Sequence, residues 1–397
     1  MWQDIKNVYH LGIAILANIF YGFPSQKLRV IGVTGTDGKT TTASLIYHIL
    51  NAAGFNASMV TSVGAVIDGK KYEVGFHVTT PSPFAVQRFF KKAVDSGSKF
   101  LVLETTSHAL DQYRVFGINF EVGVLTNVTH EHLDYHKTYE NYVKTKAKLL
   151  KMAKIAIVNR DDDSYKLISN FKFLISKLVT YGMGKNADVN PENFPFKSNL
   201  IGEFNKYNIL AAISVCKELG ISTDAIKKGI KSFVPPTGRE DVVYKKDFTV
   251  MIDFAHTPNA FDQILKSIRP QVKGKLIHVF GAAGLRDKTK RPIMGKISSQ
   301  YANIIILTSE DPRSESIEKI NKEIESGILK QRLGQVLKIS NRKKAIETAI
   351  KMAKKGDFVI VTGKSHEKSM NYGHGEKPWD EYKAVRDALK QFNNLAI

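Results

Sequence analysis

Hydrophobic and polar positions follow two rhythms along the chain. Short apolar runs, typical of buried strands, alternate with longer stretches in which apolar residues recur every three or four positions, as in amphipathic helices. Strands that alternate with helices predict a mainly parallel sheet with helices on both faces. In the first part of the chain the expected strands are 28–33, 100–104, 122–128 and 155–159, and the expected helices include 40–53, 82–96, 204–220 and 223–233.

The sequence Pro235-Pro236-Thr237-Gly238 interrupts this alternation. Two prolines and a glycine end a helix and stiffen a short connector. The alternation then resumes, with expected strands at 248–253, 276–280, 304–308 and 358–361 and helices such as 290–301 and 342–354. We therefore predict an α/β fold with a short N-terminal segment (1–27), a central mainly parallel sheet domain (28–236) and a smaller, Rossmann-like C-terminal domain (237–397).

Composition narrows the class of protein. Of 397 residues, 43% are hydrophobic and 24% charged, which is typical of a soluble globular protein. The formal net charge of +20 favours anionic partners such as nucleotides, phosphorylated substrates, nucleic acids or a membrane surface. A single cysteine, Cys216, excludes an intrachain disulfide and suits a reducing cytosol.

An apolar run at residues 11–20 lies close to the N-terminus and is interrupted by Asn18. It is shorter than the roughly 20 residues that span a bilayer. It could lie on a membrane surface, but packing on the protein body is favoured. The start of the chain also lacks the basic stretch of a signal peptide. We expect a cytoplasmic protein without membrane association.

A glycine-rich turn follows the first expected strand and leads into Lys39 and Thr40 at the start of a helix. Glycines let backbone N–H groups converge on phosphate oxygens, and the helix N-terminus favours negative charge. Lys39 would reach the terminal phosphates, and the Thr40 hydroxyl would bind Mg²⁺. Val33 stands at the first glycine position of the strict P-loop pattern. A chance lysine after a tight turn is the alternative, but the flanking strand and helix favour nucleotide binding. The expected ATP-binding residues of this P-loop are Gly35, Thr36, Asp37, Gly38, Lys39, Thr40 and Thr41.

Carboxylates and histidines follow two further strands. Glu104 ends one strand, and the stretch 127–136, with histidines at 130, 132 and 136, follows the next. Ligands bind at the carboxyl ends of strands in such sheets. Oxygen donors beside an ATP site favour Mg²⁺ over zinc, although ordinary surface histidines are an alternative.

The sequence Thr-Gly-Thr-x-Gly-Lys-Thr after a buried strand resembles the Mur ligase family, ATP-dependent amide-forming enzymes of peptidoglycan synthesis. Further matches follow in family order through nearly the whole chain after residue 30. The pattern is most similar to members that add the third residue of the stem peptide. The resemblance implies a ligase that joins meso-diaminopimelate or L-lysine to UDP-MurNAc-L-Ala-D-Glu through an acyl phosphate, with ATP and Mg²⁺.

The resemblance also implies roles for individual residues. The family places a Mg²⁺-binding histidine in T-N-x-x-x-x-H-L-D, here His132, alongside Glu104 and Thr40. The lysine of a Y-x-x-x-K-A motif is carbamylated in the family and helps to hold a second Mg²⁺; Lys146 matches it, with Lys144 and Lys148 as alternatives. The implied catalytic residues are Lys39, Glu104, His132 and Lys146.

Two sets of substrate contacts follow from the same resemblance. A G-x-F-N-x-x-N motif and the residues after the connector add nucleotide contacts. These are Asn205, Asn208, Arg239 and Asp253. Hydroxyl, amide and guanidinium groups after two strands suit a phosphorylated sugar-peptide. The expected UDP-MurNAc-peptide contacts are Thr79, Thr80, Thr106, Ser107, Gln112 and Arg114.

Loops after three strands of the C-terminal domain suit an amino acid. Guanidinium groups would bind its carboxylate, and Glu367 its ammonium group. The expected contacts are Arg286, Glu310, Asp311, Pro312, Arg313, Gly363 and Glu367. Diaminopimelate-using members carry D-N-P-R where this chain has E-D-P-R. Arg313 favours a second carboxylate, whereas Asp311 could favour the amine of lysine; we favour diaminopimelate and leave lysine open. Ser365 replaces a usual glycine.

Residues 1–27 are too few for the family's N-terminal UDP-binding domain. Either the short segment and the basic surface replace it, or the acceptor differs. Folylpolyglutamate synthase also lacks that domain, but its D-G-A-H-N-P and Gly-Lys-Gly patterns are not matched here. A nucleic-acid-binding P-loop NTPase would explain the positive charge, yet the basic residues are scattered without an arginine-rich arm. A non-catalytic Mur-like subunit is a third alternative. We expect a monomer that binds no nucleic acid.

Overall fold

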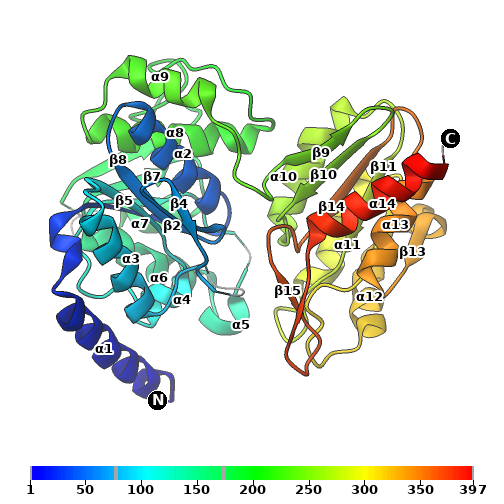
Figure 1. Cartoon of the computed structure of the whole chain (residues 1–397), viewed down its shortest axis with the longest axis horizontal. Coiled ribbons are helices and arrows are strands. Elements are labelled where there is room, and N and C mark those ends of the chain that lie inside the picture. Colours follow the sequence, from blue (N-terminus) through cyan, green and yellow to red (C-terminus); the bar gives the residue numbers. More distant parts are fainter. Residues whose placement is uncertain (1, 76–78, 130, 171–175, 396–397) are drawn as a thin grey trace. The chain divides into compact units, whose positions relative to one another are not determined.

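The computed structural model describes residues 2–75, 79–129, 131–170 and 176–395. They form two compact α/β units (Figure 1). The first unit holds most of the chain up to Val234. The second begins at Pro235 and also includes two short segments, 131–135 and 201–203. This architecture confirms the predicted α/β class.

The first unit is built on an eight-stranded sheet with the order β4-β3-β2-β5-β1-β6-β7-β8. Six strands are parallel, and β3 and β4 run antiparallel at one edge. The strands are β1 (Arg29–Thr34), β2 (Ala57–Thr61), β3 (Gly64–Ile67), β4 (Lys70–Tyr72), β5 (Phe100–Glu104), β6 (Phe120–Leu125), β7 (Ala153–Asn159) and β8 (Leu178–Tyr181).

Helices cover both faces of this sheet, and each face has its own apolar core. One core joins the sheet to α2, α8 and α9, and the other faces α3 and α6. The helices are α1 (Trp2–Tyr21), α2 (Lys39–Ala52), α3 (Pro83–Asp95), α4 (Ser107–Asp111), α6 (Tyr139–Met152), α7 (Ser164–Ser169), α8 (Glu203–Glu218) and α9 (Thr223–Ser232), with a short turn η1 (Pro24–Lys27) after α1. The short helix α5 (Leu133–His136) precedes α6 in the chain, but its first three residues belong to the second unit.

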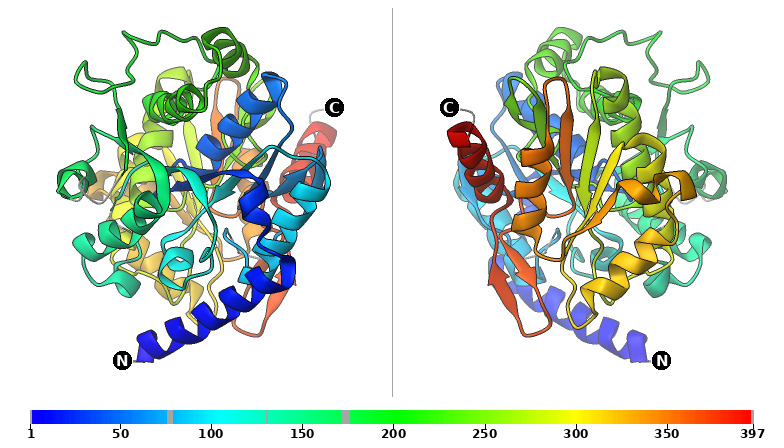
Figure 2. Two further views of the ribbon diagram at one scale, coloured as in Figure 1. Left: turned by 90° about the vertical axis from the view of Figure 1, so that its left-hand side faces the viewer. Right: turned by 90° about the vertical axis from the view of Figure 1, so that its right-hand side faces the viewer.

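The second unit has a six-stranded sheet with the order β13-β12-β11-β14-β10-β9, parallel except for β9. The strands are β9 (Asp241–Lys245), β10 (Thr249–Asp253), β11 (Leu276–Phe280), β12 (Ile304–Leu307), β13 (Val336–Lys338) and β14 (Phe358–Thr362), and β15 (Ser369–Asn371) pairs with β16 (Glu376–Pro378) in a separate hairpin. Its helices are α10 (Pro258–Ile268), α11 (Lys290–Tyr301), α12 (Ile317–Glu325), α13 (Arg342–Met352) and α14 (Glu381–Leu395), with short turns η3 (Arg269–Gln271) and η4 (Lys330–Gln335). Figure 2 shows α13 and α14 on the same side of this sheet.

The strongly apolar strands were predicted well, whereas short or polar ones were missed. Strand β6 ends at Leu125 rather than at residue 128, because the chain turns there towards the phosphate loop. Strand β2 was not predicted because it is short and partly polar. Its Ser58 is buried all the same, since the hydroxyl hydrogen-bonds with Ser98 Oγ at 2.8 Å. Residues 184–201 form an irregular segment without a helix or strand.

The pairing of parallel strands brings the predicted site residues of the first unit to one edge of its sheet. Strand β1 lies between β5 and β6, and all three are parallel. Val33 is paired with Glu104 and Thr34 with Leu125. The phosphate loop, Glu104 and the segment after β6 therefore leave the sheet side by side.

The second unit buries a neutral imidazole in its core. His278 on β11 hydrogen-bonds through Nδ1 with Ser298 Oγ at 2.9 Å and through Nε2 with Thr362 Oγ1 at 3.0 Å. Phe261 and Phe280 pack against the ring. Burial, assisted by the charge of Arg342, lowers the pKa of His278 to about 3.

We predict that acid destabilises the second unit through His278. Between pH 6.5 and about 3 the unfolded chain binds a proton that the folded chain does not, so stability falls as the pH falls. Between pH 7 and pH 5, protonation of His278 in the unfolded chain alone should lower the free energy of unfolding by about 2 kcal/mol. Denaturant unfolding followed by Trp379 fluorescence in a Trp2→Phe background measures it.

The variant His278→Gln should lose this part of the pH dependence, whatever its absolute stability. His374→Gln, which removes an exposed imidazole, should keep the wild-type dependence. Equal pH dependence in wild type and His278→Gln would contradict the prediction.

Candidate active site

The phosphate loop depends on two glycines that neighbouring side chains approach closely. Gly38 caps helix α2 with a left-handed φ of 79°, and a Cβ there would lie 2.2 Å from Asn208 Oδ1. A Cβ on Gly35 would lie 1.8 Å from Thr126 Oγ1. Any larger residue at either position would push the loop away from the side chains that shape it.

Residues after β6 hold the loop. The Asp37 amide donates to Asn127 Oδ1 at 2.9 Å, and Asn127 Nδ2 donates back to the Asp37 carbonyl at 3.2 Å. Thr126 Oγ1 also donates to that carbonyl at 2.7 Å. Asn127 and Thr126 were not predicted as site residues, although their position directly after a parallel strand was a usable signal.

Lys39 and the two asparagines of α8 lie at the same loop. Lys39 Nζ donates to the Thr36 carbonyl at 2.8 Å, which keeps its ammonium group over the loop backbone. Asn208 is buried, donates to Asn205 Oδ1 at 3.0 Å and accepts from Thr42 Oγ1 at 3.3 Å. The structure thus brings Asn205 and Asn208 to the start of α2, as a nucleotide contact requires.

Hard oxygen donors meet beside the loop. Thr40 Oγ1 donates to Glu104 Oε2 at 3.0 Å and lies 3.0 Å from Ser62 Oγ. Both Thr40 and Glu104 are almost fully buried. A buried carboxylate next to a hydroxyl fits Mg²⁺, which prefers oxygen ligands. Among the described residues no three His, Cys, Asp or Glu side chains gather at one point, so phosphate, water or modified side chains would have to complete such a site.

Lys146 is buried beneath the phosphate loop, where its Nζ donates to the Gly35 carbonyl at 2.7 Å. Burial, with repulsion from Lys39, holds the pKa of Lys146 well below its usual value. The two alternative lysines differ, because Lys144 is exposed and Lys148 is paired with Asp111.

A polar network missed by the sequence analysis adjoins Lys146. Tyr142 accepts from Thr36 Oγ1 at 3.3 Å, and its ring stacks on His136 at 4.8 Å between centroids. His136 Nε2 hydrogen-bonds with Ser107 Oγ at 3.0 Å. Burial lowers the pKa of His136 to about 4, with His108 and Lys146 contributing. The network links Ser107, expected in the peptide site, to the phosphate loop.

The expected peptide contacts form a second cluster in the first unit. Arg114 donates to Gln112 Oε1 through Nε and Nη2 and to the Thr80 carbonyl through Nη1, at 2.7–3.1 Å. Thr80 Oγ1 donates to the Glu104 carbonyl at 3.1 Å and accepts from the Thr106 amide at 2.9 Å. The Thr80 hydroxyl therefore fixes these loops. Thr79 is half-buried beside residues 76–78, which lie outside the described part of the chain.

His132 belongs to the second unit, unlike Glu104, and has a left-handed φ of 57°. Arg239 and Asp253 also belong to that unit. The Asp253 carboxylate accepts from the amides of Glu240 and Ala255, at 2.8 and 2.7 Å, and burial raises its pKa. The Arg239 guanidinium lies 4.7 Å from the centre of the Phe254 ring.

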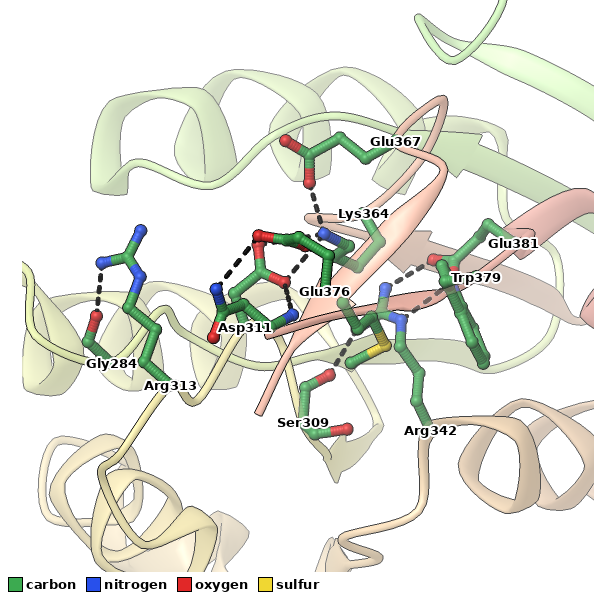
Figure 3. Close-up of polar contacts among 12 residues, drawn as sticks. Gly284, Ser309, Asp311, Arg313, Arg342, Lys364, Glu367, Glu376, Trp379 and Glu381 are labelled. Carbon is green, nitrogen blue, oxygen red and sulfur yellow. Dashed lines mark hydrogen bonds and ion pairs between the residues drawn. The ribbon is translucent and has the colours of Figure 1, made fainter. Parts of the chain in front are cut away.

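The loops expected to bind the amino acid do converge in the second unit (Figure 3). Lys364 Nζ donates to both Asp311 oxygens at 3.0 and 2.9 Å and to Glu367 Oε2 at 2.5 Å. Lys364 is fully buried, so this ion cluster is largely shielded from water. Both acids were predicted as site residues from the sequence, whereas Lys364, which neutralises them, was not.

Glu310 is a buried acid of this cluster, and one of its carboxylate oxygens can still accept a hydrogen bond. Its Oε2 has no hydrogen-bond partner among the described residues. Burial raises the pKa of Glu310 to about 8. A Cβ on Gly363 would lie 2.1 Å from that oxygen, which accounts for the glycine.

Arg313 completes the group. Its Nη1 donates to the Gly284 carbonyl at 2.7 Å, and its φ of 52° is left-handed. Burial lowers the pKa of Arg313, and the nearby charge of Arg286 adds to this. Two guanidinium groups therefore lie close enough to repel, an arrangement that an anionic ligand would stabilise.

Two family models match the chain: the Mur ligase middle domain over residues 33–216 and the Mur ligase glutamate ligase domain over residues 238–365. The UDP-N-acetylmuramoyl-L-alanyl-D-glutamate–2,6-diaminopimelate ligase of Aquifex aeolicus is 41% identical over 94% of this chain and 80% of its own.

Solved structures agree with this assignment. A UDP-N-acetylmuramoyl-L-alanyl-D-glutamate–2,6-diaminopimelate ligase is 30% identical, with a TM-score of 0.61 over 92% of this chain and 79% of that one. A Mycobacterium tuberculosis folylpolyglutamate synthase complexed with ADP shares the fold, with a TM-score of 0.73 over 93% of this chain and 95% of that one, at 18% identity. On this evidence the chain belongs to the Mur ligase family.

Proposed function

We propose that the protein is an ATP- and Mg²⁺-dependent ligase that adds meso-diaminopimelate to UDP-MurNAc-L-Ala-D-Glu. The observation that carries the chemistry is the phosphate loop beside the buried Thr40–Glu104 oxygen pair. The names of its relatives supply the substrate. The ADP complex of a fold neighbour supports the use of ATP. We expect a monomer that acts in the cytoplasm.

The reaction needs two anions to meet. The substrate carboxylate attacks the γ-phosphorus of ATP, the bond to the β-phosphate oxygen breaks, and an acyl phosphate and ADP result. Loop amides and Lys39 bind the phosphates, while Arg114 offsets the charge of the incoming carboxylate. Thr40 and Glu104 would hold Mg²⁺, which neutralises phosphate charge when bound.

The second step forms the amide. The amine of the amino acid attacks the acyl carbon, the C–O bond to phosphate breaks, and inorganic phosphate leaves. The attacking amine must first lose a proton. Glu310 is suited to accept it, since its Oε2 is unpartnered and its pKa is about 8.

Lys146 is suited to carbamylation. A neutral amine attacks CO₂ to form an N–C bond, and the loss of a proton leaves an anionic carbamate. Burial favours the neutral amine by lowering the pKa of Lys146. The ammonium form could not bind Mg²⁺, whereas the carbamate offers oxygen ligands beside the phosphate loop.

The charges in the second unit favour diaminopimelate over lysine. Asp311 could attract the side-chain amine of lysine, but Lys364 already neutralises it. Arg313 with Arg286 leaves positive charge at the site. Diaminopimelate has a side chain that ends in a carboxylate as well as an amine, and this carboxylate would pair with the remaining positive charge.

We predict that phosphate release from ATP requires both UDP-MurNAc-L-Ala-D-Glu and diaminopimelate, and that mass spectrometry detects the tripeptide product. Lysine should be the poorer substrate, and Arg313→Gln should reduce the preference for diaminopimelate. Turnover with a folate instead would favour the folylpolyglutamate-synthase alternative. Absence of turnover with every acceptor, together with a salt-sensitive shift of random DNA, would favour the nucleic-acid alternative.

We predict that Lys146→Met lowers kcat by roughly 100-fold, because a ligand-bearing group beside the phosphates is lost. Lys144→Met, an exposed change on the same helix, should leave kcat unchanged. With ¹³C-labelled bicarbonate, wild type should show a carbamate NMR signal that Lys146→Met lacks. An active Lys146→Met variant would exclude the carbamate role.

We predict that kcat/KM for the amino acid rises with pH through about 8, where Glu310 becomes ionised. Glu310→Gln should flatten this rise and lower kcat/KM on the order of 100-fold or more, the loss expected when a positioned proton acceptor is removed. The KM for ATP should not change. The control is Glu318→Gln, which changes an exposed carboxyl group of the same unit. An unchanged pH profile in Glu310→Gln would argue against a role for the Glu310 carboxyl group in proton transfer.

A further inference from the structure

Helix α1 presents its large apolar side chains outward. Phe20, Val8, Ile19 and Leu16 are 73%, 70%, 59% and 57% exposed. A helix packed on a protein usually turns its apolar stripe inward. Here the buried side carries small or polar residues instead, namely Ala14, Ala17 and Asn18.

The buried polar side chain of Asn18 fixes this orientation of α1. Asn18 Nδ2 donates to the carbonyls of Ala14 and Phe116 at 2.8 and 2.9 Å, and Asn18 Oδ1 accepts from Gln87 Nε2 at 3.1 Å. Gly117 makes room for the amide, because a Cβ there would lie 2.9 Å from it. Rotating α1 to bury its apolar stripe would break the two hydrogen bonds that connect Asn18 to Phe116 and Gln87.

The exposed stripe is continuous and extends onto α3. Outward residues at 8, 12, 15, 16, 19 and 20 follow helical spacing. The Phe84 ring of α3, itself 39% exposed, packs against Phe20 at 6.0 Å between centroids. Figures 1 and 2 show α1 at the margin of the first unit, with its N-terminal half projecting beyond α3. An apolar surface of this extent on a folded protein marks an interaction site.

The charges around the stripe indicate its partner. Exposed Lys6 and Lys27 stand near its two ends, and exposed Arg88 lies one turn beyond Phe84 on α3. The sequence has no acidic residue from Lys6 to Gly35, and the net charge of the chain is +20. Two copies pairing through α1 would bring like charges together in either direction, whereas an anionic headgroup layer would neutralise them all.

We propose that the α1 stripe binds the surface of an anionic lipid bilayer, with α1 parallel to the membrane plane. None of the described helices is long and apolar enough to cross a membrane, so the helix would rest in the headgroup region. The sequence led us to expect that this segment packs on the protein body and makes no membrane contact. One side of α1 does pack on α3, and the proposal departs from the second expectation. This inference does not depend on the proposed ligase activity.

Co-sedimentation of the full-length protein with vesicles tests this. Vesicles of phosphatidylglycerol and phosphatidylcholine should sediment the protein, pure phosphatidylcholine vesicles should do so far less, and added salt should weaken binding. The double variant Ile19→Glu/Phe20→Glu should lower binding at least about tenfold. Its matched control, Ile293→Glu/Met352→Glu, adds the same charge at exposed apolar positions of the second unit, 41% and 38% exposed, and should bind as wild type does.

Each other outcome overturns the proposal. Absence of binding to either vesicle type, or equal loss in the variant and its control, would exclude α1 as the membrane contact. A concentration-dependent dimer that Ile19→Glu/Phe20→Glu abolishes, without vesicle binding, would identify a second copy as the partner. Ligase activity on soluble substrates should be the same in both double variants, which separates loss of membrane binding from misfolding.

Discussion

The hydrogen bonds between the segment after β6 and Asp37 are the constraint on which the site of the first unit depends. They fix the phosphate loop against the sheet, and the close approach of Thr126 and Asn208 then leaves room only for glycine at Gly35 and Gly38. The loop shape in turn aims the Gly35 carbonyl at Lys146 and positions Thr40 on Glu104. Parallel register makes this possible, because it brings three strand ends to one edge.

The second unit is organised by buried charge. Arg342 is fully buried, is paired with Glu381 and donates to the carbonyls of Ser309 and Thr362. It thus joins the segment after β12 to the end of β14. Figure 3 shows its contacts with Ser309 and Glu381. Breaking such a pair on one side typically costs 3–5 kcal/mol. Lys364, which is equally buried, pairs with Asp311 and Glu367, so the amino-acid loops are held by ion pairs as well as by apolar packing.

Periodicity was enough to predict the α/β class and the strongly apolar strands, since burial on both faces requires near-continuous hydrophobic runs. It could not predict β2, whose buried Ser58 depends on a distant serine for its hydrogen bond. Motifs located the phosphate loop, Glu104 and the acidic loops. They could not show that Lys364 neutralises Asp311 or that Asn18 orients α1, because each depends on partners far apart in the sequence.

Ser365 shows how a single substitution can alter the connector. Its left-handed φ of 47° explains why glycine is usual there. The serine hydroxyl donates to the Gly238 carbonyl at 2.8 Å and so ties the end of the connector to the amino-acid loop. Arg239 N also donates to the Pro236 carbonyl at 3.1 Å. A glycine at position 365 would remove this donor, so the backbone torsions between Pro236 and Arg239 would be restricted less by the rest of the second unit.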